Sequence, residues 1–250
     1  KAVDAVLTTS PFEMEALATR ARREQRVYAI PVGNVLVSQA ELDAVFDETS
    51  EDLIPYPTAP SGAQGRKPNS LFHFGLPAKS KGLRLMLEAL HILRENMDVP
   101  AQLFLAGDYA AGEPHTEELL SLVTEFELSE GLVKLGYLKR SEIQQWAEKY
   151  MLGVFPFDEG YSTKRSSIAA LSECDLPISV GYGSPEEHPY YAPEAETAES
   201  LAALWFDLLQ GQLAENWIQQ IEKQREYGRR FRFSNIAQQH LAFYKTLRKI

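Results

Sequence analysis

Basic residues follow two separate apolar stretches of this chain, each where a strand should give way to a helix. Lys79 and Lys81 come after one of these stretches, and Lys164 and Arg165 come after the other. A helix N-terminus carries unpaired N–H groups and the positive end of the helix dipole, so cations placed there are unfavourable unless an anion joins them. Phosphate is an anion that such sites bind readily. The two loops therefore predict one shared anion, such as a diphosphate.

The second basic loop runs over residues 155–165 and is the centre of the predicted site. Pro156 and Gly160 break it, and Ser162 or Thr163 is the expected N-cap of the helix that follows. An ordinary strand-to-helix turn with two solvated basic side chains would fit the same residues, so this loop alone does not decide between the two interpretations.

Two further features belong to the same group of loops. Gly136-Tyr137-Leu138 follows a short strand and would offer a backbone edge and an aromatic face to a nucleobase, or simply a packed tyrosine at a strand end. Glu159 would either accept a hydrogen bond from a substrate hydroxyl or pair with a helix dipole.

Alternating strands and helices must hold these loops together. The expected strands cover 71–74, 102–107, 132–136, 152–155 and 176–180, and the expected helices cover 81–93, 116–126, 141–149 and the residues after the 155–165 loop. A capping box from Ser141 to Gln144 would open the third helix. This order predicts an α/β fold with a doubly wound parallel sheet, a Rossmann-like half of a larger protein, whose ligands bind beyond the carboxyl ends of the strands.

The chain divides into three predicted parts. Residues 1–34, with a strand, a helix and a second strand, are too few to bury their own core and are interpreted as the remnant of an amino-terminal acceptor domain. Residues 35–69 are rich in proline and glycine and are predicted to be a linker or loop, with a weak helix over 39–46. Residues 70–250 form the main domain.

The last part of the main domain is predicted to be helical. From Ala198 onward the pattern is almost wholly helical, in two or three pieces that break near Gly211 and again at 228–234.

Composition limits the classes of function. The chain has 44% hydrophobic and 24% charged residues and a formal net charge of −10, which argues against nucleic acid as a partner. Cys174 is the one cysteine, which excludes an internal disulfide and fits a reducing, cytoplasmic compartment; peripheral contact with a membrane stays open. The histidines and acids do not stand at metal-ligand spacing, so no metal site is expected.

The order of these motifs resembles the nucleotide-binding half of a GT-B glycosyltransferase, of the large retaining group of glycosyltransferases. The likeness extends over nearly the whole chain and rests on the segments 4–10, 30–34, 74–82, 136–138, 155–173 and 232–244. The last of these resembles the family's terminal helix, which packs back across both domains.

The resemblance assigns roles to individual residues. Lys81 is implied to bind the donor diphosphate, while Leu76 stands where many members have an arginine, a role that Lys79 or Lys164 would take over. Glu159 falls on the first of two signature glutamates, which contacts the donor sugar, and Ser167 falls on the second, which holds the ribose. The implied site comprises Glu159 and Lys81 as catalytic residues, and Gly75, Lys79, Lys81, Gly136, Tyr137, Leu138, Gly160, Tyr161, Ser162, Thr163, Lys164 and Ser167 as donor-binding residues.

The implied activity is transfer of a hexose from a nucleoside-diphosphate sugar, with retention, to an unknown saccharide, lipid or protein acceptor in carbohydrate biosynthesis. No cofactor other than the donor is expected. The chain would bind nucleotide but be inactive without the missing amino-terminal domain, and self-association or pairing with that domain is expected. The alternatives are a non-catalytic nucleotide-binding or scaffold module, a sugar phosphorylase of this fold, and a nucleotide-sugar epimerase.

Overall fold

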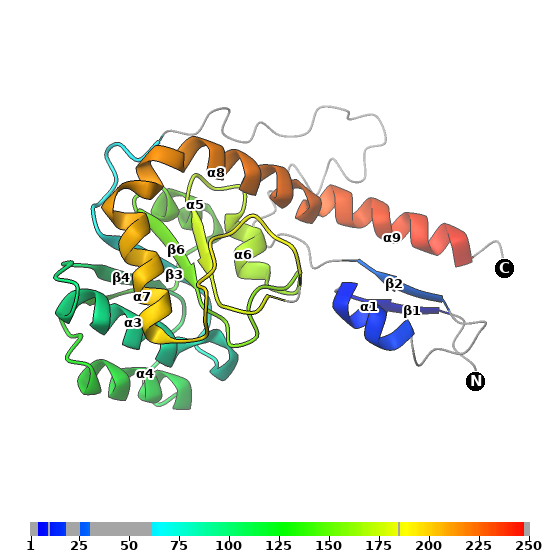
Figure 1. Ribbon diagram of the computed structural model, residues 1–250. Coiled ribbons are helices and arrows are strands. Elements are labelled where there is room, and N and C mark those ends of the chain that lie inside the picture. Colours follow the sequence, from blue (N-terminus) through cyan, green and yellow to red (C-terminus); the bar gives the residue numbers. More distant parts are fainter. Residues whose placement is uncertain (1–4, 10, 19–25, 31–61, 185, 248–250) are drawn as a thin grey trace.

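The computed structural model describes residues 5–9, 11–18, 26–30, 62–184 and 186–247. The predicted helix over 39–46 and most of the predicted linker lie outside these ranges. Figure 1 shows two α/β lobes, a small one built from the first described segments and a large one built from the rest.

The large lobe is organised around one parallel sheet. Its strands are β3 (Ser70–Phe74), β4 (Gln102–Ala106), β5 (Leu132–Gly136), β6 (Leu152–Phe155) and β7 (Ile178–Val180), in the spatial order β5-β4-β3-β6-β7. The chain moves outward from β3 to β5 and then returns to place β6 on the other side of β3. The predicted doubly wound parallel sheet is confirmed, and its topological switch point lies between β3 and β6.

The pleat of each strand sends alternate side chains into two separate cores. Leu71 and Val154 enter the core that is covered by α3 (Leu83–Glu95), α4 (Pro114–Glu125), α7 (Ala198–Asp207) and α8 (Leu213–Gly228). Phe72 and Phe155 enter the opposite core, which is covered by α5 (Arg140–Ala147) and α6 (Ser166–Leu171). Because both faces of the central strands are buried, β3 and β6 are mostly apolar, whereas the edge strand β5 is only partly buried and carries an exposed lysine, Lys134.

Two predicted helix starts are wrong. The helix after β6 begins at Ser166, not after Ser162 or Thr163, because the N–H and hydroxyl groups of Thr163 bind the Glu186 carboxylate instead of capping a helix. Lys164 and Arg165 therefore precede the helix.

The capping box of α5 is also displaced from its predicted place. The helix begins at Arg140, and the backbone N–H of Lys139 donates to the carboxylate of Glu142 at 2.7 Å. The prediction placed the box two residues too late, at Ser141 and Gln144. This pair has the same spacing as Lys139 and Glu142, so both pairs fit the motif.

The helices at the end of the chain break where the sequence predicted. A π-helical turn, η2 (Leu208–Gln212), contains Gly211 at φ 149°, and a 3-10 turn, η3 (Arg229–Phe231), separates α8 from α9 (Phe233–Leu247). Two N–H groups of Arg232, on Nη2 and Nε, donate to one oxygen of the buried Glu173 carboxylate at 2.6 Å and 2.9 Å, which fixes the start of α9 to the large lobe.

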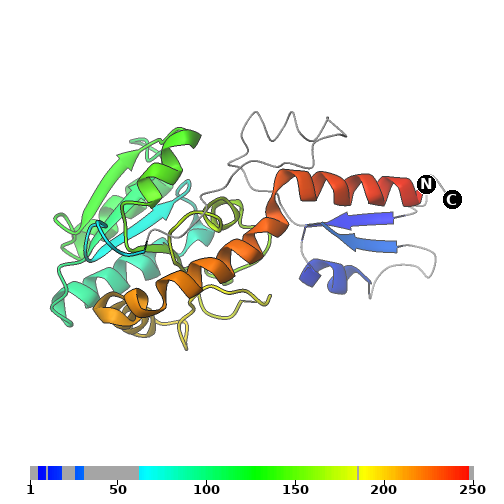
Figure 2. The ribbon, with the colours of Figure 1, turned by 90° about the horizontal axis from the view of Figure 1, so that it is seen from above.

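The small lobe packs on α9. Its strands β1 (Ala5–Thr8) and β2 (Arg26–Ala29) pair in parallel, and α1 (Pro11–Ala18) lies between them in the sequence. Figures 1 and 2 both show α9 running alongside this lobe. The rings of Tyr28 and Phe243 meet edge to face at 4.8 Å, and Ile30 is buried with Ile236. The hydroxyl of Thr163 donates to the carbonyl of Thr9 at 3.0 Å, which joins this lobe to the loop after β6.

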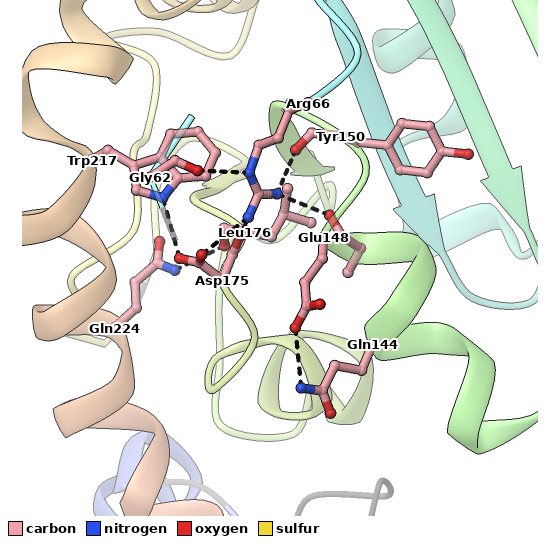
Figure 3. A network of polar contacts seen from close by, with 10 residues as sticks. Gly62, Arg66, Gln144, Glu148, Tyr150, Asp175, Leu176, Trp217 and Gln224 are labelled. Carbon is pink, nitrogen blue, oxygen red and sulfur yellow. Dashed lines mark hydrogen bonds and ion pairs between the residues drawn. The ribbon is translucent and has the colours of Figure 1, made fainter. Parts of the chain in front are cut away.

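Residues 62–69, the end of the predicted linker, are packed into the large lobe by Arg66. Figure 3 shows its guanidinium surrounded by carbonyl and carboxylate oxygens. It donates to the carbonyl oxygens of Gly62 and Tyr150 and to that of Asp175, and pairs with the Asp175 carboxylate at 3.2 Å. The side chains of Arg66 and Asp175 are 2% and 4% exposed, so this is a buried ion pair at the base of the sheet.

Candidate nucleotide-binding site

A cavity of about 520 Å³ lies over the carboxyl ends of the strands in the large lobe. Its walls come from the loops after β3, β4 and β5 and from the start of α6, which are the positions where a doubly wound sheet binds ligands. The lining residues are Phe74, Gly75, Leu76, Ala78, Lys81, Gly107, Asp108, Tyr137, Leu138, Ser166 and Ser167.

Glycines form the floor of this cavity. The N–H of Gly75 donates to the carbonyl of Ala106, and the N–H of Gly107 donates to that of Gly136, both at 2.9 Å, so the hydrogen-bond ladder continues past the strand ends. A Cβ at Gly107 would lie 2.1 Å from the carbonyl oxygen of Gly75. Glycine at this position is therefore what lets the loops after β3 and β4 approach each other.

Gly82 fixes the loop that carries Lys81. It is in the left-handed conformation, at φ 63°, and a Cβ there would lie 1.7 Å from the carbonyl oxygen of Pro156. The loop after β3 thus packs directly on the loop after β6, across the switch point of the sheet. This contact places Lys81 at the cavity.

Lys81 is a half-buried cation in an apolar setting. Its ammonium lies 4.8 Å from the centre of the Phe157 ring. Burial lowers the pKa of Lys81, and the nearby charge of Arg165 lowers it further. A cation in such surroundings is stabilised by any anion that enters the cavity.

Polar and aromatic groups line the other walls. The hydroxyl of Ser167 is buried and has no hydrogen-bond partner among the residues that the structure describes. Tyr137 is 76% exposed, whereas Leu138 beside it is buried. The cavity therefore offers a cation, an unpaired hydroxyl and a free aromatic face.

Five of the predicted donor-binding residues line this cavity: Gly75, Lys81, Tyr137, Leu138 and Ser167. Gly136 ends β5 beside it and accepts the bond from Gly107. The side chain of Lys79 lies outside the side chains that the structure describes.

The remaining predicted residues lie on the loop after β6 and do not line the cavity. Glu159 is exposed and pairs with Arg165 at 3.4 Å, and Lys164 is exposed. Tyr161 is 1% exposed and packs against the rings of Tyr190 and Tyr227. Gly160 packs against the backbone of residues 182–184, and Ser162 is half-buried. The hydroxyl of Thr163 donates to the carboxylate of Glu186.

Sequence reasoning missed the loop after β4. Gly107 and Asp108 line the cavity, and the available signal was a glycine directly after a buried strand, the same signal that marked Gly75 and Gly136. The loop after β4 carries no basic residue, so sequence reasoning based on basic residues did not include it.

His73 lies inside the large lobe, on the strand that leads into the cavity loop. It is fully buried on β3, and its Nδ1 lies 2.8 Å from the carbonyl oxygen of Val154 on β6. A carbonyl only accepts, so Nδ1 carries the proton and Nε2 keeps its lone pair. Burial lowers the pKa of His73 to about 4.

This buried histidine predicts an acid-dependent loss of stability. The folded-state pKa lies below the ordinary 6.5, so the stabilisation is complete above pH 6.5 and is lost as the pH falls towards 4. The slope expected from His73 alone is about 1.4 kcal/mol per pH unit over that window. Urea unfolding of the wild type and His73→Gln at several pH values measures it. A variant that keeps the full wild-type slope would contradict the assignment.

No group of histidine, cysteine and acidic side chains in 62–184, 186–247 or the short amino-terminal segments could hold a metal ion. None of the helices described is both long and apolar enough to cross a bilayer.

No protein-family model and no curated protein matches this sequence. Solved structures do match it. Sucrose-phosphate synthase from Thermosynechococcus elongatus matches with a TM-score of 0.71 at 18% identity, over 98% of this chain and 59% of that one. HepE from Anabaena, solved with UDP and glucose, matches with a TM-score of 0.66 at 15% identity, over 99% of this chain and 64% of that one.

A third match is the pneumococcal O-GlcNAc transferase GtfA, solved with UDP and GlcNAc, with a TM-score of 0.63 at 14% identity, over 99% of this chain and 45% of that one. The chain spans less than two thirds of the length of each of these three structures. At such identities the likeness establishes the fold, and the fold of this chain is that of the GT-B glycosyltransferases.

Proposed function

We propose that this chain is the donor-binding part of a retaining glycosyltransferase that takes a hexose from a nucleoside-diphosphate sugar. The observation that carries the proposal is the position of Lys81, a half-buried cation on the wall of a 520 Å³ cavity at the switch point of the sheet. The structures of HepE and GtfA contain UDP, which makes a uridine nucleotide the first ligand to test.

The cavity suggests how such a donor would lie. Tyr137 and Leu138 would contact the base, and the unpaired hydroxyl of Ser167 would meet the ribose or a phosphate oxygen. Lys81 would then stand against the diphosphate. When the sugar–phosphate bond breaks, negative charge grows on the diphosphate leaving group, and a cation already held in place stabilises it. We propose that the protein's own side chains supply this charge and that no further cofactor takes part.

A comparison of nucleotides by calorimetry tests the proposal. UDP, GDP and ADP are titrated into the wild type, Lys81→Ala and Lys134→Ala, the last replacing an exposed lysine of β5 that does not line the cavity. One nucleotide should bind, and Lys81→Ala should weaken its binding at least about tenfold, or 1.4 kcal/mol, while Lys134→Ala leaves it unchanged. Equal losses in both variants would contradict a diphosphate contact at Lys81.

The acceptor is proposed to bind to a part of the parent protein outside this chain. The chain alone should therefore bind donor nucleotide without transferring sugar, and efficient transfer by the isolated chain would refute this.

A second candidate is a non-catalytic nucleotide-binding module of the same fold. It is favoured by Glu159, whose side chain is 85% exposed and lies outside the cavity, and by Leu76, which puts an exposed apolar side chain on the cavity wall. This module would bind nucleotide as strongly as the enzyme would, but the full-length protein would form no donor-dependent product.

A further inference from the structure

Two cations pack against one aromatic ring beside the candidate site. The guanidinium carbon of Arg165 lies 4.3 Å from the centre of the Phe157 ring, and the ammonium of Lys81 lies 4.8 Å from the same centre. Phe157 is 1% exposed, so the ring is a fixed support for both. The two side chains come from different loops, after β3 and after β6, and meet at the switch point of the sheet.

Two exposed carboxylates, those of Glu159 and Asp158, partly compensate this pairing of like charges. The side chain of Arg165 is 15% exposed, and its Nη2 reaches the carboxylate of Glu159 at 3.4 Å, a carboxylate that is itself 85% exposed. Such a solvated contact is weak. The Nε of Arg165 is buried and lacks a hydrogen-bond partner among the described residues.

The neighbouring residues connect Arg165 with the cavity. Ser166 and Ser167 follow it directly and line the cavity wall, where the Ser167 hydroxyl is also unpaired. Lys81 and Ser167 line the cavity, and the guanidinium of Arg165 lies behind this wall on the Phe157 ring that it shares with Lys81. A group with several acceptor oxygens could satisfy all three.

We propose that Arg165 is a second cation of the diphosphate site. Its guanidinium gives up the contact with Glu159 and binds the ligand together with Lys81. The inference rests on the proposed function, because it concerns the same ligand. Leu76 supplies no charge to the cavity, whereas the guanidinium of Arg165 shares the Phe157 ring with the ammonium of Lys81. The proposal makes Glu159 a competitor of the diphosphate for Arg165.

The competition distinguishes this role from a structural one. Arg165→Gln should weaken UDP binding at least about tenfold and leave uridine binding unchanged, because only the phosphates contact the guanidinium. The UDP affinity of Arg165→Lys should lie between that of the wild type and that of Arg165→Gln. Glu159→Gln should strengthen UDP binding a few fold, since it removes the competing carboxylate. Arg84→Gln, which replaces a mostly exposed arginine that does not line the cavity, serves as the matched control and should change UDP affinity by less than about twofold.

Calorimetric titrations with UDP, UMP and uridine at one ionic strength give these affinities, and thermal unfolding confirms that each variant is folded. If Arg165→Gln does not fold, Arg165→Lys and Glu159→Gln still decide the matter. Equal loss of UDP and uridine binding, or no loss of either, would overturn the proposal. If Lys81→Ala weakens UDP binding and Arg165→Gln does not, only this inference fails. If the wild type binds no nucleotide, the proposed function fails with it.

Discussion

Replacing Arg66 with methionine is expected to destabilise the large lobe by about 3–5 kcal/mol, because it leaves the carboxylate of Asp175 buried without its partner. The pair is 3.2 Å apart with both side chains almost wholly buried. Arg66 also donates to the carbonyl oxygens of Gly62 and Tyr150, and its guanidinium stacks on the Trp217 ring at 4.5 Å. The loss therefore affects contacts to the segment before β3, the α5–β6 junction and α8 at once, as Figure 3 shows.

Urea unfolding followed by circular dichroism measures this cost. Arg84→Met is the matched control, since Arg84 pairs with Glu125 at 3.3 Å but both side chains are at least half exposed. It should cost less than about 1 kcal/mol. A double variant, Arg66→Met with Asp175→Asn, removes both charges and keeps an oxygen for the indole N–H of Trp217, which donates to Asp175 at 3.2 Å. It should be more stable than Arg66→Met alone. Similar costs for Arg66→Met and Arg84→Met would contradict the buried-pair interpretation.

Gly82→Ala is expected to abolish nucleotide binding and to cost about 3 kcal/mol or more in stability. Two effects add up at this position. An alanine is strained at φ 63°, and its Cβ would lie 1.7 Å from the carbonyl oxygen of Pro156. The loops after β3 and β6 would have to separate, and this separation would move Lys81 away from the cavity.

A second glycine isolates the steric part of this effect. Gly112 has a similar backbone conformation, at φ 86°, but nothing lies within 4 Å of a Cβ built there. Gly112→Ala should cost about 1–2 kcal/mol, from backbone strain alone, and leave UDP affinity unchanged. Thermal unfolding and UDP titration of both variants make the comparison. If Gly82→Ala binds UDP as well as the wild type does, the packing of the two loops is not what positions Lys81.

The fold was predictable from the sequence because its signals are local. Short continuous apolar runs such as 71–74 and 152–155 indicate strands buried on both faces, and the helices between them require parallel pairing. The ends of elements were less predictable. Thr163 looks like a helix cap in sequence, but its actual partners, Glu186 and the carbonyl of Thr9, are distant along the chain.

The same distinction between local and distant contacts applies to the site. Lys81, Tyr137 and Ser167 were found because each belongs to a recognisable loop. The role of Arg66 could not be predicted, since its partners come from four separate segments, and no spacing rule marks a buried arginine in a stretch rich in proline and glycine. The shared contact of Lys81 and Arg165 with Phe157 likewise depends on how two loops pack.

The packing of Tyr28 on Phe243 has a consequence for how this chain is made. The ribosome delivers β1, α1 and β2 long before α9, the helix that covers them. At about 5–20 residues per second, the interval between the two rings is roughly 10–40 s. During that time the large lobe can complete its sheet, so the contacts of Tyr28 and Ile30 with α9 form after those of the sheet. The junction between the small lobe and α9 is therefore the last part of this structure to assemble.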